Sequence, residues 1–310
     1  MKRVAIGFVI LVCCVAAFAD NPPKRPHIFG LAKVQVISSD LRATSKFYMG
    51  ALRTMQPVNC PDCDKRPPTL RFSVNGVQEV EISPVTSHEI PNRMAEIDFA
   101  TDDIPALRRF LGFNKIQVSP PKKSVDDSLV VSDPEGHRIG FRQWPASLSV
   151  QATGAGHTPD LPPHLIHAGI IVHDRAAEDH FYRDILGFHL YWHGGMKDEQ
   201  TDWVSMQVPD GTDWIEYMLN VSASADKHTR GVMNHFALGV PDIHVAQKEL
   251  LETGVRITEE PKIGRDGKWQ LNLYDPDDTR VEFMEFTPKE KPCCSEFTGP
   301  HPGPEAGQHP

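Results

Sequence analysis

The chain has 310 residues, of which 40% are hydrophobic and 24% charged, with 32 basic against 41 acidic side chains. This composition excludes a disordered or fibrous protein, and the length is enough for two ordinary domains. The formal charge is −9, and no run of Lys and Arg is longer than two residues. Such a chain offers no basic surface to a phosphate backbone, so nucleic acid is not expected as a partner.

Residues 1–19 are typical of an export signal. Lys2 and Arg3 precede an apolar stretch over 4–18, which ends in the small-x-small pattern Ala17-Phe18-Ala19. The alternative is an N-terminal membrane anchor, but this stretch is shorter than the roughly 20 residues of a membrane span. We therefore expect cleavage after Ala19 and a periplasmic or secreted protein without a membrane anchor.

Four cysteines follow the predicted signal: Cys60, Cys63, Cys293 and Cys294. An even number in an oxidising compartment indicates disulfides, for which three connectivities exist. The segment 59–64, Asn-Cys-Pro-Asp-Cys-Asp, has a soft-metal or redox motif as its alternative interpretation.

Irregular composition divides the chain. Residues 145–163 are rich in Ala, Ser, Gly and Pro and are expected to form a linker, and residues 288–310 are a Pro- and Gly-rich tail. Two domains are therefore predicted, over 29–144 and 164–287.

The two predicted domains are copies of each other. Residues of the first recur 134 positions later: Asp40, Phe47-Tyr48 and Leu52 become Asp174, Phe181-Tyr182 and Leu186.

Each copy is itself doubled. An aspartate stands seven residues after Lys33, Glu96, His167 and His235, and each of these opening runs is short and apolar, which predicts a buried strand. The aspartate stands where it can cap a following helix, such as the one indicated by Val245, Leu250 and Leu251. Further strands are predicted near each module's end, over 80–82, 138–141, 215–218 and 281–284.

The sequence resembles the vicinal oxygen chelate superfamily of glyoxalase I, fosfomycin-resistance proteins and extradiol dioxygenases. The similarity is carried by 167–188, by 233–236 with 240–242, and by 274–282, and extends more weakly over 29–144. It implies an α+β fold of two tandem domains, each built from paired βαβββ modules that form a cupped mixed sheet.

Four residues of the second domain form a candidate metal site. Glu216 follows His167 by 49 residues and Glu282 follows His235 by 47, so a two-fold relation between modules brings both pairs into one cup. Two buried carboxylates need a cation there. The resemblance places ligands of one divalent ion at these positions, and the donors suit Zn, Ni, Co, Mn or Fe(II).

The equivalent positions of the first domain are Lys33, Glu81, Glu96 and Gly140. No imidazole is present and one carboxylate is missing, so a metal is expected in the C-terminal domain only. We hypothesise that Lys33 replaces the metal charge by pairing with Glu81 and Glu96.

The resemblance implies lyase or isomerase chemistry of the glyoxalase kind. A bound metal would hold two vicinal oxygens of a small-molecule substrate and stabilise an enediolate, with Glu216 or Glu282 as general base. Asn220 matches a glutathione contact of glyoxalase I, but the matching arginine position holds Ile171, which argues against glutathione.

Two other functions compete. An extradiol Fe(II) dioxygenase would use His167, His235 and Glu282, although its characteristic tyrosine and histidine are replaced by Asn272 and Ile263. The third possibility is a non-catalytic exported protein that binds a small molecule through the same metal.

The segment 264–269, Gly-Arg-Asp-Gly-Lys-Trp, offers candidate substrate contacts. Arg265, Lys268 and Trp269 could hold an anionic or planar substrate, while the alternative is an ordinary solvated hairpin turn.

Overall fold

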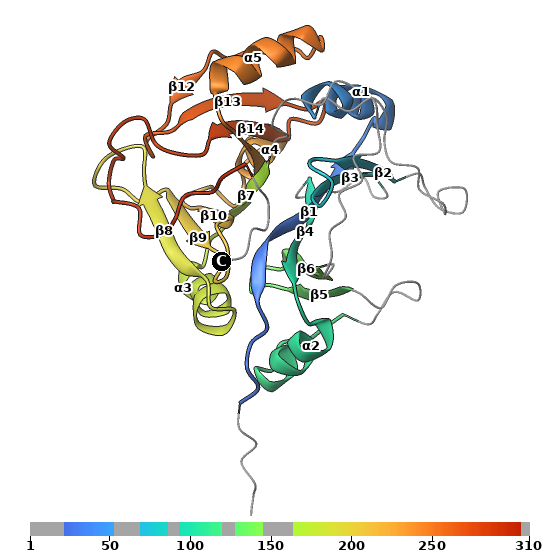
Figure 1. The fold of residues 1–310 in the computed structure, drawn as a ribbon, viewed down its shortest axis with the longest axis vertical. Helices are drawn as coiled ribbons and strands as arrows, with labels where there is room; N and C mark the ends of the chain where they lie inside the picture. Colours follow the sequence, from blue (N-terminus) through green and yellow to red (C-terminus); the bar gives the residue numbers. More distant parts are fainter. Residues whose placement is uncertain (1–21, 53–68, 86–92, 120–127, 145–163, 305–310) are drawn as a thin grey trace, which may run out of the picture.

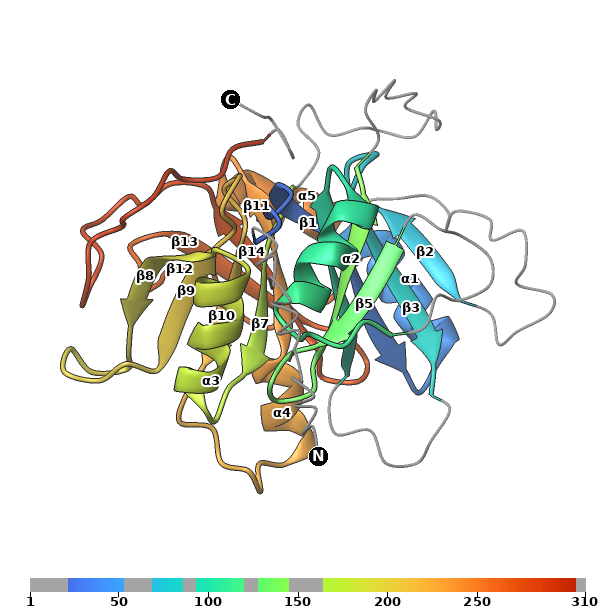
Figure 2. The ribbon, with the colours of Figure 1, turned by 90° about the horizontal axis from the view of Figure 1, so that it is seen from below.

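The computed structural model describes residues 22–52, 69–85, 93–119, 128–144 and 164–304. Within them the chain forms two curled mixed sheets, one from each half of the sequence, which lie side by side (Figures 1 and 2). The predicted α+β class with one cupped sheet per half is confirmed. No helix in the described ranges is both long and apolar enough to cross a bilayer.

Several predictions concern residues outside these ranges. The export signal over 1–19, the linker over 145–163, Cys60 and Cys63 all lie outside the described residues, so each stays a prediction.

The N-terminal sheet has the strand order β2-β3-β1-β4-β6-β5. Its central strands β1 and β4 are antiparallel, and each pairs in parallel with the last strand of its own module. In the described residues each module thus has the order βαββ. The elements are β1 (Ile28–Ser38), α1 (Leu41–Ala51), β2 (Leu70–Ser73), β3 (Glu79–Pro84), β4 (Met94–Thr101), α2 (Ile104–Phe113), β5 (Ser128–Ser132) and β6 (Arg138–Gln143).

The C-terminal sheet has the order β12-β13-β14-β11-β7-β10-β9-β8, with β7 and β11 antiparallel at its centre. Both of its modules show the predicted βαβββ order, the first helix continuing into a π-helical turn, η2. The elements are β7 (His164–Ile171), α3 (Arg175–Asp179), η2 (His180–Ile185), β8 (His189–Gly194), β9 (Trp203–Gln207), β10 (Trp214–Met218), α4 (Lys227–Met233), β11 (His235–Val240), α5 (Ile243–Glu252), β12 (Lys262–Ile263), β13 (Trp269–Tyr274) and β14 (Arg280–Glu285).

The aspartates after the opening strands cap the helices as predicted. Each of the four accepts a hydrogen bond from a backbone N–H in the first turn of its helix: Asp40, Asp103, Asp174 and Asp242. The helix indicated by Val245, Leu250 and Leu251 is present as α5. Leu250 is buried, but Val245 and Leu251 are 53% and 57% exposed, because the inward face follows Ile243 and Ala246.

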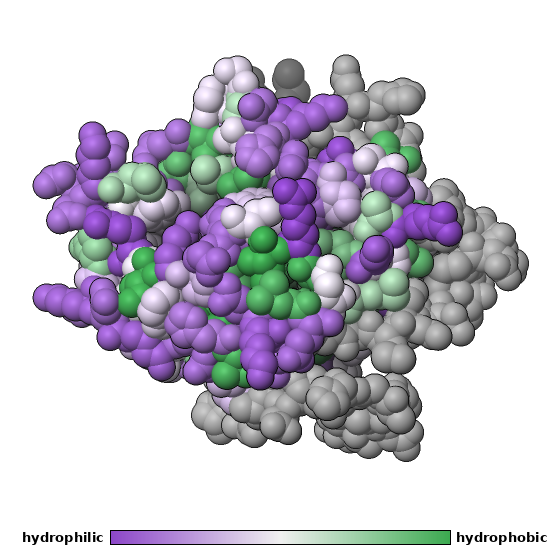
Figure 3. All heavy atoms as spheres, turned by 90° about the horizontal axis from the view of Figure 1, so that it is seen from above, coloured by the Kyte–Doolittle hydropathy of each residue, from purple (hydrophilic) through white to green (hydrophobic). Residues whose placement is uncertain are grey.

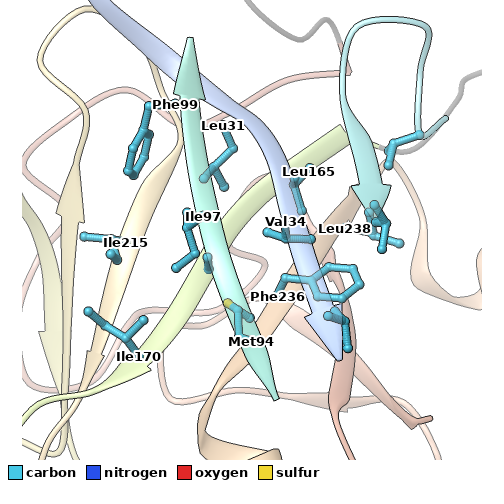
Figure 4. Packing of buried hydrophobic residues seen from close by; sticks show 14 of the residues in the cluster. Leu31, Val34, Met94, Ile97, Phe99, Leu165, Ile170, Ile215, Phe236 and Leu238 are labelled. Carbon is cyan, nitrogen blue, oxygen red and sulfur yellow. The ribbon is translucent and has the colours of Figure 1, made fainter. Parts of the chain in front are cut away.

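One continuous core joins the two sheets. Side chains of β1 and β4, such as Val34 and Ile97, lie against side chains of β7 and β11, such as Leu165 and Phe236 (Figure 4). The buried Gln78 crosses the junction, with its Nε2 donating to the carbonyl oxygens of Leu31 and Leu165 at 2.9 Å each. The halves therefore share their apolar interior, and each leaves its cup on the other side of its sheet.

The outer surface is largely polar on the face shown in Figure 3, which views the molecule from the side of α1 and α5. This face is mostly hydrophilic, with a small hydrophobic area near its centre. Among the described residues, the buried apolar side chains form two clusters, one in the shared interior and one in the C-terminal cup.

Candidate metal centre

Four adjacent strands of the C-terminal sheet carry the predicted metal ligands. In the order β14, β11, β7 and β10 these are Glu282, His235, His167 and Glu216. The strand register aligns Glu216, Gly169 and His235 in one row across the sheet. It aligns His167, Ala237 and Glu282 in a second row, two residues along the strands. The duplication thus places each histidine close to the glutamates of both modules.

The four side chains meet around one point. The Nε2 atoms of His167 and His235 are 3.1 Å apart. Glu282 Oε2 lies 3.7 Å from the first and 3.6 Å from the second. Glu216 Oε2 lies 4.0 and 3.5 Å from the same atoms. A single ion could contact both imidazoles and a carboxylate, since ligand atoms of His167, His235 and Glu282 all lie within 4.8 Å of one another.

Both imidazoles have the protonation state that a metal requires. Burial lowers the pKa of His167 and of His235 well below the ordinary value, so both rings are neutral at neutral pH. His235 Nδ1 lies 3.1 Å from the carbonyl oxygen of Met233, which places the ring N–H on Nδ1 and the lone pair on Nε2. That lone pair accepts from Arg280 Nη2 at 2.7 Å, so a metal bound to Nε2 would take the place of the Arg280 donor.

The carboxylates show that the cup suits a cation. Burial raises the pKa of Glu282, Arg280 opposes this, and the charge of Glu216 adds to it, so that the value is about 7. His167 Nδ1 is buried without a hydrogen-bond partner in the described part of the chain. Neutral nitrogen and acidic oxygen donors around one point fit a divalent transition metal.

Local backbone features make room for the two rings. A register shift between β7 and β11 leaves Ile166 unpaired. As a result, Ile166 and His167 both contact the aromatic side of the cup. The His167 ring stacks there on Trp214, with ring centroids 4.7 Å apart. Gly169 lies against the His235 ring, where a methyl group would overlap the ring atoms. Neither the bulge at Ile166 nor the role of Gly169 was predicted from the sequence.

A cavity of about 290 Å³ opens beside the cluster. Its wall includes Glu216 and Glu282 together with four tryptophan or tyrosine side chains and a phenylalanine: Tyr191, Trp192, Trp203, Trp214 and Phe297. The cavity can therefore take a small planar molecule next to the metal ligands.

Two of the predicted substrate contacts reach this cavity. Lys268 is fully buried there, with Nζ 3.3 Å from the Tyr191 hydroxyl and 4.9 Å from the centre of the Trp214 ring. Burial lowers its pKa to about 8, although the nearby Asp266 raises it. Arg265 lines the rim and forms an ion pair with Asp198.

The other two predicted contacts lie elsewhere. Asn220 is an exposed turn residue with φ of 61°, and its amide donates to Asp202 and to the carbonyl of Thr201. The Trp269 ring packs edge to face against His244 of α5. Neither lines the cavity, so the structure gives no support for a substrate contact at either position. The order of residues in a hairpin did not reveal which face of the strand each side chain would occupy.

The C-terminal tail completes the cavity wall, which its composition did not predict. After β14 the chain runs without regular structure along β8, and the Thr298 N–H donates to the Tyr191 carbonyl at 3.0 Å. This places Phe297 in the cavity wall. Cys293 and Cys294 form a disulfide with each other, which is compatible with one of the three predicted connectivities.

The N-terminal cup contains ion pairs at the equivalent positions. Lys33 is buried, with Nζ 3.0 Å from Glu96 and 3.2 Å from Asp98. Glu81 instead accepts from Gln35 and Arg71. The expected pairing of Lys33 with Glu96 is thus present, but its pairing with Glu81 was wrong.

Asp98 explains this difference. It stands beside Gly140 in the strand register, and a methyl group at Gly140 would overlap its carboxylate. Asp98 therefore fills the space left by the missing fourth acid, and Arg142 holds it at 2.5 Å. Burial alone would raise the pKa of Glu96, but Lys33 and Arg138 outweigh it and bring the value to about 2. The cup is neutralised by the chain's own cations.

Comparisons with known proteins agree with this architecture. The model of the family described as "Glyoxalase/Bleomycin resistance protein/Dioxygenase superfamily" matches residues 164–283. No curated protein matches the sequence.

Among solved structures, the chain is similar to the 2,3-dioxygenase LapB from Pseudomonas sp. KL28, at 13% identity and a TM-score of 0.64 over 91% of this chain and 96% of that one. It is also similar to homoprotocatechuate 2,3-dioxygenase from Brevibacterium fuscum in complex with 3,4-dihydroxyphenylacetate, at 15% identity and a TM-score of 0.60 over 84% and 82%. The enzyme of the same name from Arthrobacter globiformis has 15% identity and a TM-score of 0.61, over 84% of this chain and 80% of that one. At these identities the likeness concerns the fold alone.

Proposed function

We propose that the protein is a metal-dependent enzyme whose C-terminal cup binds a small molecule through two vicinal oxygens. The proposal proceeds from the match of residues 164–283 to the model of the Glyoxalase/Bleomycin resistance protein/Dioxygenase superfamily. His167, His235 and Glu282 would hold one divalent ion, Zn, Ni, Co, Mn or Fe(II), with Glu216 as a fourth ligand. When bound, the ion supplies Lewis acidity to the substrate oxygens. The N-terminal cup, neutralised by Lys33, takes no metal.

Lyase or isomerase chemistry is the function that the geometry supports best. The observation that carries it is the position of Glu216, a second carboxylate within 4.0 Å of both imidazole nitrogens. A two-histidine, one-carboxylate site has no need of this residue. Glu282 would stay on the metal, and Glu216 would give up its place as fourth ligand to the substrate. Glu216 could then take a proton from the carbon next to the substrate oxygens and return it to a neighbouring carbon.

A ring-cleaving dioxygenase is the second candidate. The compact trio of His167, His235 and Glu282 has the composition of a facial triad on Fe(II), and the similar folds include 2,3-dioxygenases. The cavity wall argues against this function. Ile263 and Asn272 line it where the resemblance would place a histidine and a tyrosine, and Asn272 donates to Glu259.

The substrate we propose is planar and anionic. Lys268 is fully buried among aromatic rings, and in the described ranges no carboxylate oxygen lies within ion-pair distance of its Nζ. A buried ammonium with one hydrogen-bond partner can donate to a ligand carboxylate.

Two hydroxypyranones test this substrate class. Kojic acid and comenic acid share one ring and one pair of chelating oxygens, but comenic acid carries a carboxylate where kojic acid has a hydroxymethyl group. We expect zinc-loaded protein to bind comenic acid about tenfold more tightly by calorimetry. This preference should vanish in Lys268→Met and persist in Lys262→Met, which changes a cavity lysine already paired with Glu259. Equal affinities in the wild-type protein would refute the anionic substrate.

The reaction class is tested on protein first analysed for metals after purification without added metal. Deuterium incorporation from D₂O into dihydroxyacetone by the Zn, Ni, Co or Mn form, lost in His235→Ala, would support the isomerase. Oxygen uptake on catechol by the Fe(II) form alone would refute it in favour of the dioxygenase. Tight metal-dependent binding of comenic acid without turnover would indicate a binding protein.

A further inference from the structure

Two of the junctions between the two halves of the molecule have the same design. In the first, the turn over 133–137 lies against α3, and the Tyr182 hydroxyl donates to Asp133 at 3.1 Å. In the second, the turn over 275–279 lies against α1, and the Tyr48 hydroxyl donates to Asp275 at 3.3 Å. Each aspartate also accepts backbone N–H groups from its own turn. The second junction is therefore an internal control for the first.

The junctions differ in their charged groups. Where the second has Thr279 and Thr44, the first has His137 and Glu178, by the internal repeat. His137 Nδ1 lies 2.7 Å from Asp133 Oδ2. Ligand atoms of Asp133, His137 and Glu178 all lie within 4.8 Å of one another.

Glu178 lacks the partners that a buried carboxylate needs. Glu178 is fully buried. Its Oε1 accepts from the Glu135 N–H at 3.1 Å, but its Oε2 has no hydrogen-bond partner in the described part of the chain. Burial raises the pKa of Glu178 to about 8, and the charge of Asp133 adds to the effect.

The surroundings of Glu178 are rich in acidic groups. The charges of Asp133, Glu135 and Asp174 each raise the pKa of Glu178, because they repel its ionised form. The imidazole of His173 is paired with Glu135, and Arg175 with Asp179. His137 is thus left as a single imidazole for two buried carboxylates, and the group needs either a proton or a cation.

We propose that Asp133, His137 and Glu178 bind a divalent cation that joins the N-terminal half to the C-terminal half. One imidazole and two carboxylates are a donor set for zinc, cobalt or manganese. The His137 side chain is 15% exposed and gives the ion a route from solvent. A cation bonded to Asp133 and His137 replaces the proton that these side chains share. This site uses none of the ligands of either cup, so it is independent of the proposed function.

The test counts zinc in protein whose cup has been emptied by His235→Ala. Metal-stripped protein is given zinc, freed of excess, and analysed for zinc per chain. We expect one equivalent in His235→Ala, none after adding Glu178→Gln or Asp133→Asn, and one after adding Asp275→Asn, the matched change at the second junction. No zinc in His235→Ala, or retention after Glu178→Gln, would overturn the proposal. Equal zinc in the wild-type protein and His235→Ala would instead count against the cup.

A melting experiment shows whether the variants remain folded. Glu178 keeps a proton on folding that the unfolded chain releases, so the stability of metal-free protein falls from about pH 5 to about pH 8. Glu178→Gln removes this dependence, and its melting temperature in a chelator should equal or exceed that of the parent near pH 8. Zinc should raise the melting temperature of His235→Ala but not of His235→Ala with Glu178→Gln. A zinc-induced rise in both would refute the site.

Discussion

Gly169→Ala tests the proposed metal centre with a single methyl group. Gly169 stands between Glu216 and His235 in the strand register. A Cβ here would lie well inside van der Waals contact with Cε1 and Nδ1 of His235, and 3.0 Å from its Nε2. The backbone at this position is not left-handed, so alanine introduces no backbone strain and acts through the ring alone.

The size of the effect follows from the overlap. Restoring an ordinary carbon–carbon separation of about 3.5 Å moves the His235 ring by roughly 1.4 Å. Metal–nitrogen bonds tolerate deviations of only about 0.2 Å. We therefore expect metal affinity to fall about 100-fold, or about 3 kcal/mol. Crowding of the cup should lower the free energy of unfolding by about 1–3 kcal/mol, so the protein should still fold.

The assay is zinc affinity by competition with a chromogenic chelator, in a Glu178→Gln background so that only the cup is measured. Gly112→Ala is the matched control, because a Cβ at this position of α2 meets nothing within 4 Å. We expect the control to bind zinc like its parent. Unchanged affinity in Gly169→Ala would refute the reasoning, since a fixed ligand ring cannot accept the added methyl group.

Three further predictions concern charge in the two cups. Substitution of His235 by alanine should remove one equivalent of bound metal, whereas substitution of Lys33 should remove none. Equal loss of metal from both variants by elemental analysis would contradict the assigned cup. Glu96, with its pKa lowered to about 2, should contribute about 3 kcal/mol to stability above about pH 4.5, a contribution lost as the pH falls through about 2. In acid and urea titrations Glu96→Gln should therefore be less stable than wild type at pH 7, with the gap closing towards pH 2, and a constant gap would argue against the ion pair with Lys33. Lys268, with its pKa lowered to about 8, destabilises the fold by about 3 kcal/mol below that pH and progressively less up to about pH 10.5. Lys268→Met should thus be the more stable protein in urea at pH 7, and a less stable variant would show that the ammonium is not isolated.

The sequence by itself determined the duplicated architecture. Repeated spacing between an opening strand and its capping aspartate is a local signal, because strand burial and helix capping depend on neighbouring residues. The same repeat related His167 to His235 and Glu216 to Glu282, and a two-fold relation of modules needs no further information to bring equivalent positions together.

Tertiary structure alone decided what surrounds these positions. Gly169 next to His235, and Asp98 in the space beside Gly140, are relations between neighbouring strands whose partners are far apart in the chain. Lys33 therefore pairs with Asp98, which no spacing indicated. The tail forms part of the cavity wall because its backbone donates a hydrogen bond to β8. The junction of Asp133 with Glu178 exists only because the two halves pack together. Register, bulges and the contacts between halves are set by the packing of distant segments, which periodicity within a segment does not contain.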